Sequence, residues 1–228
     1  MIDPLVITFD LDDTLYPEMD FVRSGFESVA RYLAPLCGES WPTLYGELLT
    51  SLEVDGRGRQ FDVLLARRAV ANVTVPDLVT RYRAHKPTLQ LPGAALSALG
   101  DIRAAGHSIF VLTDGDPVVQ RTKVEALGLR SVIDGVICTW DEGRSAGKPN
   151  PRGFSRLLAE TGARPRELVY VADNPVKDFI AVRRAGGRSI RLLAGPYRDV
   201  VPAGPQYMPD VTIERLGDVP RALRTLRP

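Results

Sequence analysis

A short apolar segment near the start of the chain runs directly into three aspartates. Residues 5–9 read Leu-Val-Ile-Thr-Phe, and Asp10, Asp12 and Asp13 follow. A continuous apolar run of this length is typical of a strand buried on both faces, as in a parallel sheet. Carboxylates at the end of such a strand cost stability unless a cation, hydrogen bonds or chemistry compensates them. Turn formation and helix capping account for one or two of these acids, but not for Asp10 and Asp12 together.

Length and composition are those of a globular protein with one large domain, or a core with a smaller companion. The chain has 228 residues, of which 44% are hydrophobic and 25% charged, and its formal net charge is +1. This balance gives no electrostatic attraction to nucleic acid or membrane, so we expect neither as a partner. Met1 leads almost at once into the first strand, which leaves no room for a signal peptide, and no apolar run has transmembrane length. We therefore expect a cytoplasmic protein.

Cysteine and histidine offer no recognisable site. Cys37 and Cys138 lie far apart and fit no metal or redox spacing, so core packing is the expected role. His85 and His107 are also isolated, which argues against a zinc site and against a Ser-His-Asp triad. Acid–base chemistry in this chain must therefore use carboxylates and lysine.

Lysine is scarce and arginine dominates the 29 basic residues. The lysines are Lys86, Lys123, Lys148 and Lys177. A chain that usually has arginine can need a compact ammonium group where it has lysine. By itself this observation points to no particular site.

Between about Tyr16 and Leu91 the apolar residues recur at helical spacing, and no convincing strand is seen. The segment Asp55-Gly56-Arg57-Gly58-Arg59 reads as a loop. About four amphipathic helices are expected, which would form a small bundle inserted after the first strand. The apolar positions include Phe21, Phe26, Val29, Leu33, Leu44, Leu48, Leu52, Phe61, Leu64 and Leu65.

From Leu91 onward, strands alternate with helices. Apolar runs predict strands at 108–112, 135–139, 168–172 and 189–193, with a short last one at 211–213. Helices are expected over 92–105, 116–128, 150–162 and 174–185, and 194–209 is expected to be a loop. This alternation predicts a doubly wound, Rossmann-like parallel sheet. We expect an α/β core domain of residues 1–16 and 91–228 and a helical domain of residues 17–90.

Further polar residues follow the later strands, where ligands bind in open parallel sheets. Thr113 and Asp114 begin a turn before a helix N-terminus, whose free N–H groups suit a phosphate. Lys148 lies in a loop before a helix, with Pro149 after it. Asp173 follows a strand and Asp178 falls in the next helical turn, so the two carboxylates could hold a hard cation. Taken singly, Thr113 and Lys148 are equally well explained as a turn cap and a surface lysine.

Together these residues form a recognisable set of four motifs. They are Asp10-Leu11-Asp12-Asp13-Thr14, Thr113 at a strand end, Lys148-Pro149, and Asp173 followed by Asp178. The set resembles the haloacid dehalogenase-like (HAD) phosphatase superfamily along the whole chain, and the helical insert resembles the family's cap between the first and second motifs. Two positions depart from the usual pattern: Asp114 stands where Asn is frequent, and Ala172 stands where Gly is frequent.

The resemblance implies a Mg²⁺-dependent phosphomonoester hydrolase that works through an aspartyl-phosphate. By resemblance, Asp10 is the nucleophile and Asp12 the general acid/base. The phosphate-binding residues it implies are Thr113, Asp114 and Lys148. The metal ligands it implies are Asp10, Asp12 through its carbonyl, Asp173 and Asp178, the last directly or through water.

The superfamily that this set resembles also contains dehalogenases, mutases and ion pumps. Dehalogenase chemistry needs no acid for the leaving group, so Asp12 argues against it, and the chain is too short for an ion pump. A sugar phosphomutase uses the same two acids and stays open. A receiver-like phospho-acceptor module is less favoured, because its acceptor would follow the third strand, where the chain has Cys138-Thr139-Trp140-Asp141.

The substrate is not determined by the sequence. The resemblance suggests a small phosphorylated metabolite such as a sugar phosphate, a nucleotide or flavin mononucleotide. Arg57 and Arg59 could reach a remote anionic group from a loop made flexible by glycine, and Phe21 and Arg23 are the next candidates. A mobile, solvated loop explains Arg57 and Arg59 equally well.

Overall fold

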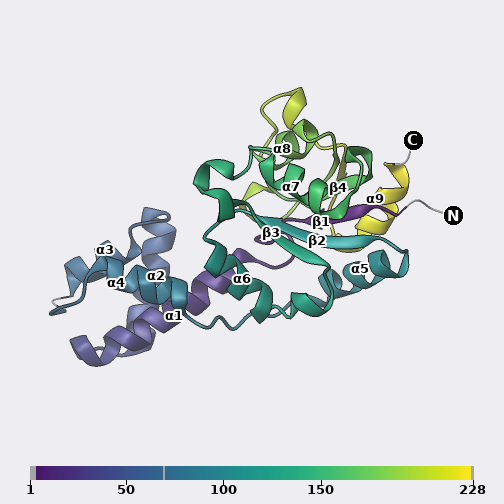
Figure 1. Cartoon of the computed structure of the whole chain (residues 1–228). Coiled ribbons are helices and arrows are strands. Elements are labelled where there is room, and N and C mark those ends of the chain that lie inside the picture. The colour runs from purple at the N-terminus through teal and green to yellow at the C-terminus, as the bar shows by residue number, and fades with distance from the viewer. Residues whose placement is uncertain (1–3, 69, 227–228) are drawn as a thin grey trace. The chain divides into compact units, whose positions relative to one another are not determined.

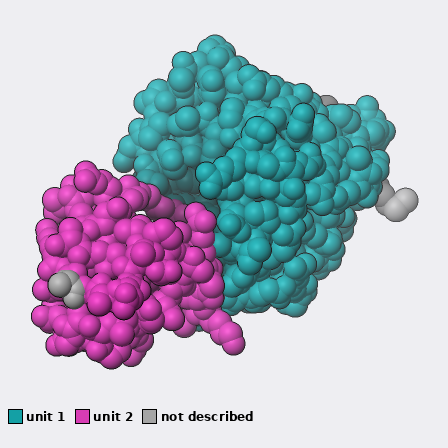
Figure 2. All heavy atoms as spheres, turned by 60° about the vertical axis from the view of Figure 1, so that its left-hand side comes forward, with its two compact units in different colours: residues 1–17, 90–228 teal, residues 18–89 magenta. Residues whose placement is uncertain are grey.

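The computed structural model describes residues 4–68 and 70–226. The chain divides into two compact units (Figure 2), which we call unit 1, up to Pro17 and from Gln90 onward, and unit 2, Glu18–Leu89. That the units act as a core and a cap stays a prediction. Residues 1–3, 69 and 227–228 of the two expected domains lie outside the described residues.

Unit 1 contains a six-stranded parallel sheet (Figure 1), which confirms the predicted fold class. The strand order is β3-β2-β1-β4-β5-β6, so β1 is flanked by β2 and β4. In this register Phe9, the last residue of β1, pairs with Val111 and Val171. The strands are β1 Val6–Phe9, β2 Ser108–Thr113, β3 Gly135–Cys138, β4 Leu168–Ala172, β5 Arg188–Leu192 and β6 Val211–Ile213.

Helices cover both faces of this sheet, α5 and α6 on one and α7 and α8 on the other (Figure 1). Apolar strand residues pack against the helices, as Tyr170 of β4 does against Phe154 of α7. The helix α9 was not predicted from the sequence. The helices are α5 Gly93–Ala104, α6 Pro117–Ala126, α7 Arg152–Thr161, α8 Asp178–Arg184 and α9 Val219–Thr225.

Unit 2 is helical, as predicted. Capping residues define two of its helix starts: Ser40 accepts a hydrogen bond from Thr43 N, and Thr74 and Asp77 form a capping box. The predicted apolar positions form its core, including Phe26, Leu33, Leu44, Leu48, Phe61 and Leu64. The helices are α1 Glu18–Cys37, α2 Trp41–Asp55, α3 Gln60–Arg67 and α4 Val75–Ala84.

The predicted loops are mostly confirmed. Gly56 and Gly58 have φ of 72° and 99°, values that favour glycine, and the chain turns there between α2 and α3. The segment 194–209 is a loop that contains two short 3₁₀ turns, Gly195–Tyr197 and Pro205–Tyr207. Within the described residues, no helix is both long enough and apolar enough to cross a bilayer.

Candidate active site

Asp10 lies directly after β1, at the carboxyl end of the sheet, where the fold reverses its strand order. Its N–H donates to Val171 O of the neighbouring strand at 2.9 Å, which fixes the backbone at this point. The carboxylate is buried and accepts a hydrogen bond from Lys148 Nζ at 2.9 Å. The first predicted acid is therefore in contact with the predicted lysine.

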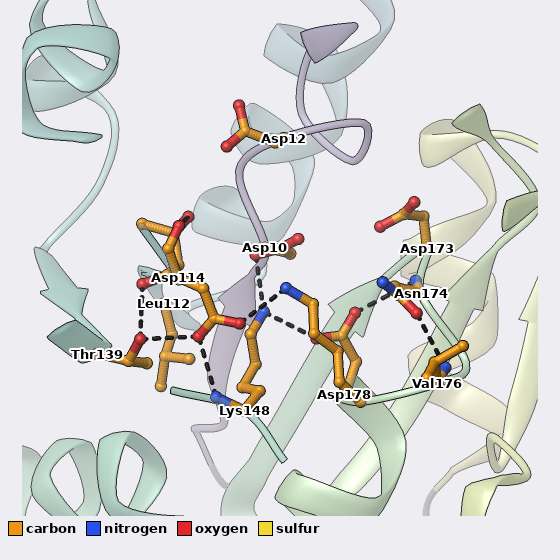
Figure 3. A network of polar contacts seen from close by, with 12 residues as sticks. Asp10, Asp12, Leu112, Asp114, Thr139, Lys148, Asp173, Asn174, Val176 and Asp178 are labelled. Carbon is orange, nitrogen blue, oxygen red and sulfur yellow. Dashed lines mark hydrogen bonds and ion pairs between the residues drawn. The ribbon is translucent and has the colours of Figure 1, made fainter. Parts of the chain in front are cut away.

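Lys148 lies between two carboxylates (Figure 3). Its Nζ is 2.9 Å from Asp10 Oδ1 and 2.8 Å from Asp178 Oδ1, and it donates to the Tyr170 hydroxyl at 2.6 Å. Burial by itself would lower the pKa of Lys148, but Asp10 and Asp178 raise it well above its ordinary value. Lys148 is a charged ammonium group inside the protein, not a surface lysine.

Three carboxylates meet at this end of the sheet. Oxygens of Asp10, Asp173 and Asp178 lie within 4.8 Å of one another, and all three residues are buried. Asp173 follows β4, and Asp178 begins α8 with one oxygen accepting from Asn174 N at 3.2 Å. Burial, followed by repulsion from Asp10 and Asp178, raises the pKa of Asp173 to about 8.

The charges of this cluster match a divalent cation. Within the described residues, ion pairs join three carboxylates to two ammonium groups, and Asp173 adds a fourth carboxylate to the cluster. With all six groups ionised, this set carries an excess of two negative charges. The groups are Asp10, Asp114, Asp173, Asp178, Lys148 and Lys177. Oxygen ligands and this excess charge fit a hard divalent ion.

Asp12 lies on the turn after Asp10 and contacts a different set of residues. Its carboxylate accepts from Lys123 Nζ at 2.8 and 2.9 Å, from Tyr16 OH at 2.7 Å and from Gln120 Nε2 at 2.9 Å. Burial would raise the pKa of Asp12, but the Lys123 charge and these hydrogen bonds hold it below its ordinary value. These contacts favour the ionised form of Asp12.

The predicted phosphate turn follows β2. Thr113 Oγ1 accepts from Gln120 Nε2 at 2.7 Å. The Asp114 carboxylate accepts from Thr139 Oγ1 at 2.7 Å, from Lys148 N at 3.1 Å and from Lys177 Nζ at 2.7 Å. Asp114 therefore ties the Lys148 loop and Lys177 to the end of β2.

The remaining predicted residues lie in unit 2. Arg57 pairs with Glu18 at 2.6 Å, Arg59 is exposed at the start of α3, and Arg23 lies 3.7 Å from Asp20. Phe21 is buried, with its ring against those of Tyr82 and His85. These contacts give Phe21 a packing role within unit 2.

Sequence reasoning missed several residues of the site. The missed residues are Tyr16, Gln120, Lys123, Tyr170 and Lys177. Each forms a hydrogen bond through its side chain with a site residue that was predicted. The scarcity of lysine was a signal for two of them. Lys123, Lys148 and Lys177 all pair with a carboxylate here, while Lys86 is exposed.

Tyr170 offers a test of how the site is held together. It is fully buried, and its hydroxyl accepts from Lys148 and donates to Leu112 O at 3.1 Å. We expect Tyr170→Phe to lower the free energy of unfolding by about 1–3 kcal/mol, because two buried polar groups lose a partner. Urea unfolding followed by circular dichroism measures this, with Tyr207→Phe at a partly exposed position as the control. An unchanged unfolding free energy in Tyr170→Phe would contradict the contact.

The fold and this cluster define an α/β protein with a buried acidic, lysine-containing site at the switch point of a parallel sheet. The chain belongs to the haloacid dehalogenase-like hydrolase family, whose model matches residues 5–186. This confirms the resemblance predicted from the four motifs. Hydrolases of this family generally use a metal ion, in keeping with the acidic cluster. Because the chain belongs to this hydrolase family, the alternative of a receiver-like phospho-acceptor module no longer applies.

Curated relatives extend over most of the chain. A glyceraldehyde 3-phosphate phosphatase from Methanopyrus kandleri is 29% identical over 232 residues, covering 96% of this chain and 97% of the relative. A phosphoserine phosphatase from Thermus thermophilus is 30% identical over 163 residues, covering 72% of this chain and 63% of the relative.

A solved structure shows the same fold. A 2-haloacid dehalogenase from Pseudomonas syringae has a TM-score of 0.66 at 23% identity, covering 98% of this chain and all of that one. Its name refers to a different reaction from those of the curated relatives. The fold therefore does not select the reaction, which depends on the site residues.

Proposed function

We propose that this protein is a phosphatase that hydrolyses a small phosphomonoester with the help of Mg²⁺, through an aspartyl-phosphate on Asp10. The observation that carries the proposal is the placement of Asp10, buried beside Lys148 and within one cluster with Asp173 and Asp178. Relatives named for glyceraldehyde 3-phosphate and phosphoserine support it, since both compounds are small phosphomonoesters.

The reaction has two steps. First, an Asp10 oxygen attacks phosphorus, the bond from phosphorus to the leaving oxygen breaks, and Asp12 gives that oxygen its proton. Second, Asp12 takes a proton from water, the water oxygen attacks phosphorus, and the bond from phosphorus to Asp10 breaks. Inorganic phosphate and the original carboxylate of Asp10 result. Asp12 must carry a proton when the first step begins and be ionised when the second begins, and the proton that it takes from water restores it for the next turnover. Its contacts with Lys123, Tyr16 and Gln120 favour the ionised form that the second step requires.

Other residues bind the phosphoryl group. Lys148 Nζ contacts Asp10 Oδ1 and can therefore donate to a phosphoryl group on that carboxylate. The Thr113 hydroxyl donates to another phosphoryl oxygen. Because the side chain of Asp114 is anionic, we assign its phosphate contact to backbone N–H groups of the turn, while its carboxylate positions Lys148 and Lys177.

The residues that would hold the cation are Asp10, Asp173 and Asp178, with the backbone carbonyl of Asp12. Carboxylate and carbonyl oxygens suit Mg²⁺. When bound, the cation supplies positive charge that lets a carboxylate approach an anionic phosphate.

Binding of Mg²⁺ should stabilise the protein. A cation relieves the repulsion among three buried carboxylates, so we expect about 2.7 kcal/mol of added stability at a Mg²⁺ concentration one hundred times its Kd. Thermal unfolding with and without Mg²⁺ measures this, with NaCl at equal ionic strength as the control. The increase in Tm should be largely lost in Asp173→Asn. Equal increases in the parent and in Asp173→Asn would argue against the site.

A panel of phosphorylated metabolites tests the proposed function. It should contain glyceraldehyde 3-phosphate, phosphoserine, sugar phosphates, nucleotides and flavin mononucleotide. We expect Mg²⁺-dependent release of inorganic phosphate from at least one of them over many turnovers. Transfer of labelled phosphate to a second sugar hydroxyl would identify a mutase instead. If the protein hydrolyses none of these esters and no aryl phosphate either, the proposal is wrong.

We propose that unit 2 acts as a cap that selects the substrate through Arg57 and Arg59. We expect Arg57→Ala or Arg59→Ala to raise KM by about 2- to 5-fold with kcat unchanged, as for a solvent-exposed charge that binds ground and transition states equally. Steady-state kinetics on the best metabolite measures this. Arg67→Ala, at the exposed end of α3, is the control. Unchanged KM values in both variants would make the loop a connector only.

The predictions of cellular location and of binding partners come from the sequence alone. A cytoplasmic location, and the lack of nucleic-acid or membrane partners, stay predictions.

A further inference from the structure

The helix α6 buries two polar side chains. Gln120 and Lys123 are 2% and 3% exposed and lie three residues apart, on the face that also buries Val119 and Val124. A buried ammonium group is costly unless a partner compensates it. For Lys123 that partner is Asp12, with Nζ 2.8 and 2.9 Å from the two carboxylate oxygens.

The Asp12 carboxylate is held at both oxygens. Oδ1 accepts from Tyr16 and Lys123, and Oδ2 accepts from Gln120 and Lys123. The donors come from the turn after β1 and from α6. Rotation of the carboxylate would break several of these bonds at once, so α6 fixes its orientation.

Gln120 also connects Asp12 to the proposed phosphate site. Its amide donates to Asp12 Oδ2 at 2.9 Å and to Thr113 Oγ1 at 2.7 Å. The Thr113 hydroxyl itself donates to Asp114 O over a long 3.4 Å. Because Thr113 accepts the bond from Gln120, its single hydroxyl proton can turn from Asp114 O to a phosphoryl oxygen. Gly115 makes room for the amide: it has φ of 131°, and a Cβ there would lie 3.1 Å from Gln120 Cδ.

We propose that Lys123 and Gln120 are positioning residues for the reaction, Lys123 for Asp12 alone and Gln120 for Asp12 and Thr113 together. The inference rests on the proposed function, in which Asp12 is the general acid/base. A structural counter-ion would stabilise Asp12 without affecting a particular step, whereas a positioning residue affects the step in which Asp12 acts.

The test uses an aryl phosphate, because its leaving group needs no general acid but hydrolysis of the aspartyl-phosphate still needs a general base. We expect Lys123→Met to lower kcat about tenfold or more, with kcat/KM near the parent value, because only the second step slows. Rapid-mixing kinetics with 4-nitrophenyl phosphate should then show a burst of about one nitrophenolate per enzyme. Glu125→Gln, on the exposed face of α6, is the matched control and should show parental kinetics.

Two further variants separate the roles. In the Asp12→Asn background, Lys123→Met should cause no further loss, because its effect passes through Asp12. Gln120→Leu should also lower kcat/KM and weaken inhibition by inorganic phosphate, because Thr113 loses its partner. If Lys123→Met does not fold, two other measurements test the proposal. One compares Asp12→Asn with the double variant Asp12→Asn, Lys123→Met, in which both charges are removed. The other is the kinetics of Gln120→Leu.

The outcomes are distinguishable. If the parent hydrolyses no phosphate ester, the proposed function fails and this inference with it. In another outcome, the parent is active while Lys123→Met shows no burst and either lowers kcat and kcat/KM by the same factor or changes neither. Either result overturns only the inference on Lys123 and leaves the proposed function in place. An additive loss in the Asp12→Asn background would also overturn it.

Discussion

Replacing Asp10 with Asn is expected to lower phosphate release by roughly 10³-fold or more, since the variant lacks the attacking oxyanion. Asn has nearly the same shape as Asp, so the N–H bond to Val171 O should survive and the sheet should form as before. Loss of one of the two carboxylates beside Lys148 is the main structural cost. Phosphate release with Mg²⁺ and circular dichroism on the same samples separate inactivation from unfolding.

The control for Asp10→Asn is the same change at Asp116. This residue caps α6 by accepting from Val118 N at 3.0 Å, and Asn caps a helix about as well as Asp. Asp116→Asn should therefore keep parental activity. Acid quenching during turnover of a ³²P-labelled ester should trap a hydroxylamine-sensitive phosphoprotein in the parent but not in Asp10→Asn. Full activity of Asp10→Asn would end the assignment of the nucleophile.

The strand ends of the site could be predicted because a parallel sheet brings them together. Apolar runs mark β1, β2 and β4. Asp10 and Asp173 directly follow β1 and β4, and Thr113 is the last residue of β2. Once the sheet is parallel, these residues must meet at one edge. Lys148 lies in a loop, and geometry alone would not have placed it. Its position was predicted only through the resemblance to a family.

The residues from helices were missed because a helix position does not by itself show which way a side chain points. Gln120 and Lys123 stand beside Val119 and Val124 on the apolar face of α6, and polar residues there were an unused signal. Lys177 precedes α8 and is brought to Asp114 only by tertiary packing. The structure also gives a physical reason for Asp114, which stands where the family often has Asn: its carboxylate pairs with Lys177.

The short helix α9 was missed for a different reason. It has only seven residues, and its buried residues Val219, Ala222 and Leu223 make up a single helical repeat. A segment this short shows too few repeats to reveal a helical period. Its stability comes from packing, including contacts with α5 and β6, which the local sequence does not record.

Asp12→Asn should have a large effect that depends on the leaving group. An alkyl oxide is a poor leaving group and needs a proton as it departs, whereas a nitrophenolate leaves unaided. We therefore expect kcat/KM on an alkyl phosphate to fall by about 10²–10⁴-fold, the usual contribution of a general acid, and kcat/KM on 4-nitrophenyl phosphate to change far less. This ratio reports the step in which the leaving group departs, because kcat/KM covers events up to the first irreversible step.

A structural role for Asp12 gives a different result. Asn can still accept hydrogen bonds through its carbonyl oxygen, but it removes the carboxylate charge that faces the buried Lys123, so some loss of stability is expected. Such a loss lowers the amount of folded enzyme and reduces kcat/KM on both esters by the same factor. Normalising to active enzyme, by titration of the phosphoprotein, removes that contribution. If the alkyl and aryl esters then lose rate equally, Asp12 is a structural residue and the leaving oxygen takes its proton from elsewhere.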